Sequence, residues 1–468
     1  MLIGELKKVL FLSGGIFLGT AVHAQYLRTS YFMEGTSSRL QLNPGLQPTR
    51  GYFNVPVLGS FNIGASSNVL GMSDIVDVLD AGSDLYSNDG LYNRLKEDNR
   101  LNVNLNTDIL SFGWYKGKGF WSVNVGLRTD IGASIPKNMF EYLRDADRFN
   151  MESGNIQGNI SNMSFDMNAY AEVGLGYSRP INDRLTVGGR FNVLLGIANA
   201  EMRVDEFDVD MRLPENPDDP SSWNGSYGGH ASARAHIKTT IKGGGLSFAD
   251  SYDSYGTPVR QIDGFDFDGG GFGISGMGFG IDLGASYKLL DNLTLSASIL
   301  DLGFIKWKSS STTMASTNQS EEIEINQNNY QEYLDGDFLS LERFNLAEEE
   351  ASSYKTRLSS TLVLGGEYAF LENRMSVGAM YSVRFVQPKA LNELTLLATV
   401  RPNSWFNAAF SYSPIQAGGK SFGLALKLGG FFVGTDYMFF GNSSKAVNGF
   451  IGLSFPLGRK KVSDTDAI

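Results

Sequence analysis

Strict alternation of apolar and polar residues, repeated in many separate segments, limits how this chain can fold. From Met277 to Leu289 every second residue is apolar, and the residues between them are Gly, Ser, Asp or Lys. A repeat of two residues indicates a β-strand with one apolar and one polar face. Many such strands in an exported protein indicate a transmembrane β-barrel, in which lipid covers the outer face and a polar lumen lies inside.

The N-terminal 24 residues have the pattern of a signal peptide. Lys7 and Lys8 precede an apolar stretch, Val9–Val22, and Ala24 ends a small-residue cleavage site. The apolar stretch is too short to favour a permanent membrane span. We therefore expect export from the cytoplasm and removal of residues 1–24.

The composition excludes several functional classes. The 468 residues include no Cys, which excludes disulfides, thiol catalysis and Cys-ligated metals. The formal net charge is −11 and no basic stripe is present, so nucleic-acid binding has no electrostatic support. Ser-His-Asp hydrolysis would have to use His230 or His236, which lie away from any nucleophile motif. We therefore expect neither an enzyme nor a bound cofactor.

The connections between the alternating segments are of two kinds. Six are short and contain residues that tight hairpins require: Lys116–Gly119, Asn182–Arg184, Asp291–Asn292, Leu371–Asn373, Pro402–Ser404 and Gly429–Gly430. Four are long, spanning residues 66–100, 137–161, 206–276 and 309–353. Tight turns at one end and long loops at the other are typical of a bacterial outer-membrane barrel, with the long loops extracellular.

The parity of the turns predicts the number of strands. If every short turn is periplasmic and residues 206–276 add no strand to the wall, the chain forms an all-β antiparallel barrel of about fourteen strands. The strand-like segment Ala233–Leu246 is then part of a hairpin above the membrane. Residues 51–456 form the barrel, and the last strand ends in Phe455, a signal that barrel assembly machinery reads. Residues 457–468 are a periplasmic tail.

Two segments before and within the first strand resemble a known family. Asn43-Pro44-Gly45-Leu46 resembles the Asn-Pro-Ala plug segment of the FadL family of long-chain fatty-acid transporters, with Gly45 in place of the usual Ala. Arg50–Leu58 is similar to uncharacterised outer-membrane proteins with a FadL-like barrel. The resemblance implies a plug at residues 25–50 inside the barrel, and sideways or plug-gated passage of hydrophobic molecules. No residue that contacts fatty acid can be carried over.

Charged residues on the polar faces have two interpretations, a selectivity track or structural pairing. We expect them to pair with each other and with the plug. They are Asp166, Glu172, Arg190, Asp282, Lys288, Glu367, Arg384, Glu393, Lys427 and Asp436.

Two groups of residues are candidate metal ligands. Asp263, Asp266 and Asp268 could gather around Ca²⁺, although their spacing does not fit an EF-hand and a solvated acidic loop is the better interpretation. His230 and His236 would share a strand face, but no third zinc ligand is evident. The sequence leaves calcium binding open and gives no support for zinc.

The sequence therefore predicts a barrel in the outer membrane of a Gram-negative bacterium, in contact with lipid and lipopolysaccharide. The leading function is passive uptake or exchange of hydrophobic small molecules, with Asn43, Pro44, Gly45 and Leu46 as plug and gating residues. The alternative is a scaffold or secretion accessory that binds a protein partner through its extracellular loops. A soluble exported β-sandwich is a third interpretation.

Overall fold

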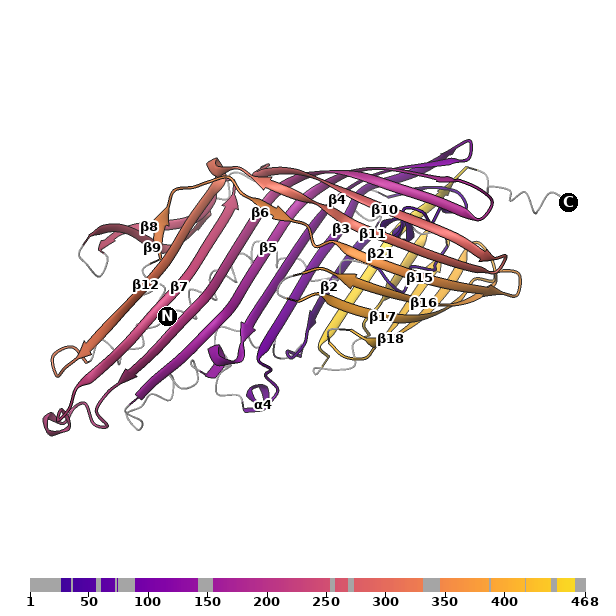
Figure 1. Cartoon of the computed structure of the whole chain (residues 1–468). Coiled ribbons are helices and arrows are strands. Elements are labelled where there is room, and N and C mark those ends of the chain that lie inside the picture. The colour runs from indigo at the N-terminus through magenta and orange to yellow at the C-terminus, as the bar shows by residue number, and fades with distance from the viewer. Residues whose placement is uncertain are drawn as a thin grey trace.

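The first strand of the chain pairs with the last, so the sheet closes into a barrel (Figure 1). In the register, Gly51 lies opposite Leu457, and Phe61 lies opposite Ile451. The computed structural model describes residues 27–34, 37–55, 60–71, 74, 89–141, 155–252, 257–267, 273–330, 346–386, 389–416, 418–438 and 444–458. The predicted signal peptide and the tail from residue 459 onward lie outside the described residues.

The described part of the barrel wall has fourteen antiparallel strands, as the parity of the turns predicts. Two of the fourteen are interrupted: β1 (Gly51–Asn54) continues as β2 (Ser60–Ser67), and β14 (Lys355–Arg357) continues as β15 (Thr361–Phe370). The others are β3 (Asp98–Lys116), β4 (Gly119–Pro136), β5 (Asn155–Pro180), β6 (Leu185–Arg212), β10 (Gly276–Leu290), β11 (Leu293–Trp307), β16 (Met375–Arg384), β17 (Leu391–Val400), β18 (Phe406–Ile415), β19 (Ser421–Leu428), β20 (Phe431–Thr435) and β21 (Ala446–Leu457).

The short turns gather at one end of the barrel, at the right in Figure 1. Gly117 and Gly429 lie in two of these turns with φ of 62° and 61°, a left-handed conformation that glycine adopts at little cost. The long connections leave from the opposite end. The predicted asymmetry of short turns and long connections is therefore confirmed.

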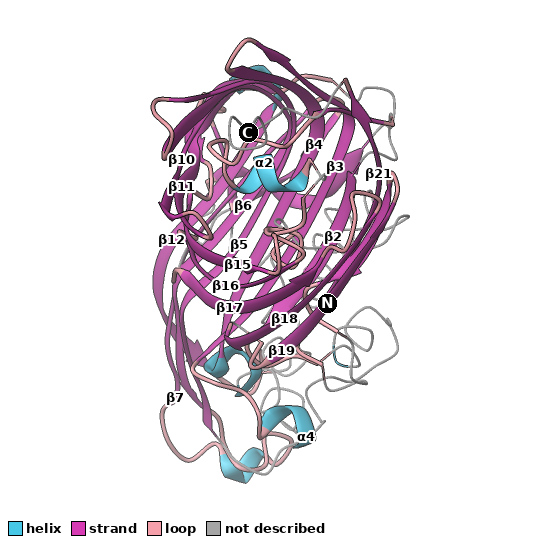
Figure 2. Ribbon diagram, turned by 90° about the vertical axis from the view of Figure 1, so that its right-hand side faces the viewer, coloured by secondary structure: helices cyan, strands magenta, loops and turns pink. Residues whose placement is uncertain are grey.

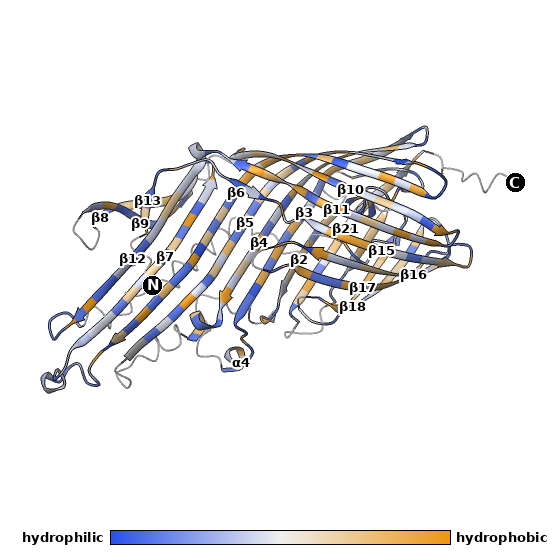
Figure 3. Cartoon of the chain, in the orientation of Figure 1, coloured by the Kyte–Doolittle hydropathy of each residue, from blue (hydrophilic) through white to orange (hydrophobic). Residues whose placement is uncertain are grey.

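The two faces of the wall follow the alternation in the sequence, which Figure 3 shows as alternating colours along the strands. Leu283 and Phe191 point outward, and each side chain is 50% exposed. Asp282, the neighbour of Leu283, points inward and is fully buried. An apolar outer surface of this extent is what lipid contact requires, and the fold is that of an outer-membrane β-barrel.

The sheet of the wall continues beyond the barrel at the long-loop end (Figure 1). β5 and β6 have 26 and 28 residues and continue past the wall, where β7 (Tyr227–Ile241) and β12 (Thr312–Ile325) join them. β7, β8 (Gly244–Tyr252), β9 (Pro258–Phe267), β13 (Ala347–Glu349) and β12 then pair in a ring. We call this region the extension.

The extension corrects the interpretation of residues 206–276 and 309–353 as loops, because both contain strands. Their Gly, Ser, Thr and Glu content hid the strand pattern, and an apolar core supplies what local sequence does not. Met163, Met167, Met202 and Met211 are buried in this core together with Ile237. The hairpin expected above the membrane is present, because residues 233–246 run from β7 through a tight turn into β8.

The described helices are short. They are α2 (Ser38–Leu42), α4 (Asp89–Tyr92), and the 3-10 turns η1 (Pro220–Ser222) and η2 (Ser309–Ser311). Of the helices in the described part of the chain, none has the length and apolarity needed to cross a membrane.

Candidate functional site

The chain enters the lumen before it forms the wall. Residues 27–50, of which 35 and 36 are not described, lie inside the barrel, where Figure 2 shows α2 surrounded by strands. We call this stretch the inner segment. Its apolar residues Tyr31, Met33 and Leu42 are at most 2% exposed. The segment occupies the region for which the sequence predicts a plug.

The four predicted plug residues form a compact turn against the wall. The Asn43 side chain donates hydrogen bonds of 3.1 Å to the carbonyl oxygens of Ala285 and Ala297, and its Oδ1 accepts from Gly45 N at 2.8 Å. Leu46 N donates to Asn43 O at 3.1 Å. Asn and Pro favour this turn because Asn bonds nearby backbone and Pro fixes its own φ. The turn is thus tied to β10 and β11.

Two inward glycines make room for this turn. A Cβ atom at Gly188 would lie 2.5 Å from the carbonyl carbon of Pro44, and one at Gly284 would lie 2.9 Å from Pro44 Cδ. Both positions are closer than a side chain can approach without displacing its neighbour. The sequence shows these residues as small and inward-facing, but not what they contact.

The first part of the inner segment contacts the opposite side of the wall. Thr29 N donates to Asp436 Oδ1 at 2.6 Å, and the hydroxyl groups of Thr29 and Ser411 lie 2.7 Å apart. Arg28 forms an ion pair of 2.9 Å with Glu393 and donates to the Tyr437 hydroxyl. The inner segment therefore spans the lumen from β10 and β11 to β18 and the end of β20.

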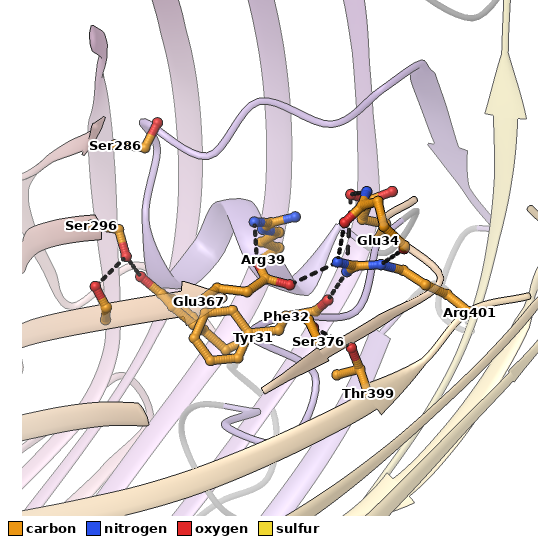
Figure 4. Close-up of polar contacts among 12 residues, drawn as sticks. Tyr31, Phe32, Glu34, Arg39, Ser286, Ser296, Glu367, Ser376, Thr399 and Arg401 are labelled. Atoms are coloured by element: carbon orange, nitrogen blue, oxygen red, sulfur yellow. Dashed lines mark hydrogen bonds and ion pairs between the residues drawn. The ribbon is translucent and has the colours of Figure 1, made fainter. Parts of the chain in front are cut away.

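A carboxylate on β15 bridges the inner segment and the wall (Figure 4). Glu367 accepts from Arg401 Nη2 at 2.9 Å and from Arg39 Nη2 at 3.4 Å. Arg401 also donates to the carbonyl oxygen of Phe32 at 3.1 Å. One buried negative charge thus pairs with a cation from the wall and a cation from the inner segment. Sequence reasoning missed Arg401, because it lies at a turn outside the alternating faces.

Most of the predicted inward charges do pair with each other or with the inner segment. Besides Glu367, Glu393 and Asp436, the pairs are Arg190–Asp282 at 2.7 Å, Arg128–Glu172 at 3.6 Å, Arg203–Asp166 at 2.6 Å and Arg384–Asp130 at 2.8 Å. Lys427 donates to the carbonyl oxygen of Ser404 at 3.3 Å, and Lys288 is exposed. These contacts favour the structural interpretation over a selectivity track.

Two cavities lie on opposite sides of α2. The loop-side cavity and the open solvent at its mouth together have about 750 Å³ of empty space, and the cavity walls include Leu42, Val363, Met380 and Arg384. The turn-side cavity has about 380 Å³ of empty space, and its walls include Leu40, Gln41, Pro44, Ser178 and Arg190. Between the two cavities stands the single helical turn of α2, with Leu42 toward one cavity and Leu40 toward the other.

The candidate metal ligands do not form a site in the described part of the chain. Asp263 and Asp266 lie on β9, and Asp268 lies outside the described residues. His230 and His236 lie on β7, and each faces a carboxylate, Glu322 at 3.2 Å and Glu201 at 3.4 Å. No group of three His, Cys, Asp or Glu side chains suited to a metal ion occurs among the described residues.

Residues 44–436 match the model of a family of unknown function (DUF5723), a range that begins within the inner-segment turn, at Pro44, and covers almost the whole wall. The chain belongs to the DUF5723 family. No curated protein is similar enough in sequence to be matched to this DUF5723 member.

Several solved barrels match this DUF5723 chain over nearly its full length at low sequence identity. The Ralstonia pickettii toluene transporter TbuX is 10% identical, with a TM-score of 0.39, covering 94% of this chain and 96% of that chain. The Pseudomonas putida toluene transporter TodX is 9% identical, with a TM-score of 0.33 and coverage of 93% of both chains. The CymD monoaromatic hydrocarbon channel is 10% identical, with a TM-score of 0.34, and the match covers 95% of this chain and 96% of that chain.

Proposed function

We propose that this protein carries hydrophobic small molecules passively across the outer membrane of a Gram-negative bacterium, and that the inner segment gates their passage. The observation that carries the proposal is the pair of cavities inside the closed barrel, with residues of α2 lining both of them. A molecule that enters from the long-loop end reaches the loop-side cavity first. A shift of α2 would join this cavity to the turn-side cavity.

One of several apolar clusters inside the barrel supports a hydrophobic cargo. Tyr31, Phe32 and Leu42 of the inner segment pack against inward-facing residues of four strands, which are Leu300, Val363, Met380 and Leu397. Apolar side chains in a water-accessible lumen gain little unless they contact each other or an apolar ligand. The cluster borders the loop-side cavity through Leu42, Val363 and Met380.

The two parts of the inner segment have different roles in this proposal. Asn43, Pro44, Gly45 and Leu46 anchor the segment through the bonds to β10 and β11. α2 is held less firmly, because it has one turn and its N-cap residue, Ser37, makes no capping bond. The Ser37 hydroxyl instead accepts from Asn54 at 2.6 Å. A single uncapped turn has little intrinsic stability, so α2 moves together with the residues ahead of it, which contact β18 through Thr29.

A disulfide lock tests whether movement of the inner segment is needed. The hydroxyl groups of Thr29 and Ser411 lie 2.7 Å apart, which suits a disulfide after Thr29→Cys/Ser411→Cys, and the chain has no other Cys. Oxidation should reduce uptake of an apolar dye by intact cells, and reduction should restore it. The matched control is Thr395→Cys/Ser413→Cys, whose hydroxyl groups lie 2.8 Å apart within the wall.

The control disulfide should leave uptake unchanged. If the oxidised Thr29–Ser411 lock transports as fast as the reduced form, the gate is not the inner segment. If uptake in both forms equals that of cells without the protein, the transport proposal itself is wrong.

The extension favours a second candidate function, a scaffold that binds a protein partner outside the cell. Its charged face carries exposed residues such as Glu206, Arg234 and Glu322, which a transport channel does not require. Native mass spectrometry of the protein extracted from membranes distinguishes the two functions. Retained small molecules support transport, and a retained protein at fixed stoichiometry supports the scaffold.

A further inference from the structure

The outward face of β11 changes from apolar to basic toward the long-loop end. Leu302 points outward and is 38% exposed, and Phe304, the next outward residue, is half-buried. The two outward positions that follow are Lys306 and Lys308, and both are exposed. Lys306 lies opposite Met277, where the alternating run of β10 begins. The strand therefore leaves the lipid-facing band and enters a basic surface at the margin of that band.

The neighbouring strand, β14, adds two more cations to this surface. Lys355 lies directly opposite Lys306. Thr356 accepts a hydrogen bond of 2.8 Å from the buried indole of Trp307, which places Thr356 on the inner side of the wall. Its neighbours Lys355 and Arg357 therefore point outward, and both are exposed. We use the name basic patch for Lys306, Lys308, Lys355 and Arg357.

The cations of the basic patch have no ion-pair partner in the part of the chain that the structure describes. The Lys308 ammonium donates to the carbonyl oxygen of Ile274 at 3.1 Å, and the Lys355 ammonium lies 4.5 Å from the centre of the Phe304 ring. Like charges directly opposite each other destabilise a sheet, so Lys306 and Lys355 weaken the pairing of their own strands.

This pairing has little else to support it. β14 pairs with β11 over three residues, Lys355–Arg357, and the strand is interrupted before β15 begins. An anion held between Lys306 and Lys355 would remove their repulsion and join the two strands through charge-assisted hydrogen bonds. The local structure is therefore more stable with an anion bound than without one.

The place of the basic patch indicates what kind of anion fits. A small anion dissolved in water has no use for an apolar surface beside its binding site. Here Leu302 and Phe304 continue from the patch into the lipid-facing band. Lysine and arginine are the usual phosphate-binding side chains. A lipid with phosphate groups at the membrane surface and acyl chains below them matches both parts of this surface.

We propose that the basic patch binds the phosphate groups of lipid A, the phosphorylated glycolipid of the outer leaflet, while the acyl chains lie along Leu302 and Phe304. Lys306 and Lys355 hold one phosphate group between them, and Arg357 contacts it from the side of the acyl chains. The inference goes beyond the proposed function, because it requires no transport. It relies on that proposal for the location in the outer membrane with the long-loop end outside.

A set of lipid probes tests the chemistry of the head group. The full-length protein in dodecylmaltoside is titrated with lipid A that carries two phosphates, and the retained lipid is counted by native mass spectrometry. Lipid A with the same acyl chains and no phosphate, and phosphatidylglycerol, are titrated in parallel. Bisphosphorylated lipid A should bind roughly tenfold more tightly than either of the other two.

A double substitution tests the residues. Lys306→Gln/Lys355→Gln should weaken binding of bisphosphorylated lipid A roughly tenfold. The lipid-free variant should be at least as heat-resistant on gels as the native protein, because the like-charge pair is gone. Added lipid A should raise the unfolding temperature of the native protein and leave that of the variant unchanged. The matched control is Lys288→Gln, an exposed lysine at the tight-turn end of β10, which should behave as the native protein does.

The inference is overturned if phosphate-free lipid A or phosphatidylglycerol binds as tightly as the bisphosphorylated form, or if the double variant binds lipid A as the native protein does. Inorganic phosphate alone should not raise the unfolding temperature. An equal rise with inorganic phosphate would show a site for a dissolved anion and overturn the lipid assignment. Failure of the transport proposal is seen separately, in the disulfide-lock assay, which does not involve the basic patch.

Discussion

Gly188 of β6 lies directly against Pro44 of the inner segment, and a methyl group at Gly188 would come within 2.5 Å of the Pro44 carbonyl carbon. Its neighbour Gly189 faces outward, where a Cβ atom would meet Asp282 O and Leu283 Cδ2 at an ordinary 3.5 Å. A substitution at Gly188 therefore tests the contact with the inner segment, and the same substitution at Gly189 tests the outer surface of the same strand.

We expect Gly188→Ala to displace the turn around Pro44 and to destabilise the barrel by about 1–3 kcal/mol, the usual cost of overpacking. Gly189→Ala should be nearly neutral. Thermal unfolding of the two purified variants measures the difference. Leakage of a small polar solute should also rise only in Gly188→Ala. Equal melting temperatures would show that the turn does not press against β6.

The outward face can be tested with one charge placed on each side of the wall. Leu283→Arg puts a cation in lipid and should cost about 2–4 kcal/mol if the site is near the bilayer midplane, reducing assembled barrel in outer-membrane fractions. Asn102→Arg puts the same side chain in the loop-side cavity, near Asp130, and should assemble better. Poor assembly of Asn102→Arg with normal assembly of Leu283→Arg would invert the assignment of faces.

Single cysteines test the orientation in the membrane, because the native chain has none. Glu215 is exposed in the extension beyond β6, and Lys118 is exposed in the turn between β3 and β4. A membrane-impermeant maleimide should label Glu215→Cys on intact cells, and Lys118→Cys only after lysis. Labelling of Lys118→Cys on intact cells would place the tight turns outside.

The extension should lose stability in acid through Glu201. A hydrogen bond from His236, aided by Lys238 and Arg203, lowers the pKa of Glu201, which lies on β6 beyond the wall. A carboxyl with a lowered folded pKa stabilises the folded state above its unfolded pKa of about 4.3, and this contribution is lost as the pH falls through the folded value. The protection factors of the β6 and β7 amides, which are corrected for the intrinsic exchange rate at each pH, should therefore fall as the pH drops below the unfolded pKa. In Glu201→Gln that fall should be smaller.

The alternation in the sequence was enough to predict the wall. In β10, exposure alternates from Met277 to Leu283 as the polarity of the residues indicates, because lipid and lumen impose opposite requirements on neighbouring positions. The tight turns were predictable for the same local reason, since residues such as Gly429 are needed for their backbone conformation.

The extension and the contacts of the inner segment could not be predicted in the same way. β7 and β12 are rich in Ser, Thr and Ala, and their strand structure depends on the apolar core that they share with β6. The pairing of Thr29 with Ser411 joins residues 382 positions apart, and no local pattern encodes such a partner. Asn43 was recognisable as a turn residue, but its acceptors on Ala285 and Ala297 were not.

The position of the inner segment ahead of β1 sets an order for barrel biogenesis. β1 and β2 form the final seam by pairing with β21, the last strand to be synthesised. We expect the segment that precedes β1 to be enclosed as that seam closes, since the paired backbone of the described wall gives it no way in from the side. The seam therefore traps the amino-terminal residues, and a barrel that closes before they are in place would be a stable but misassembled product.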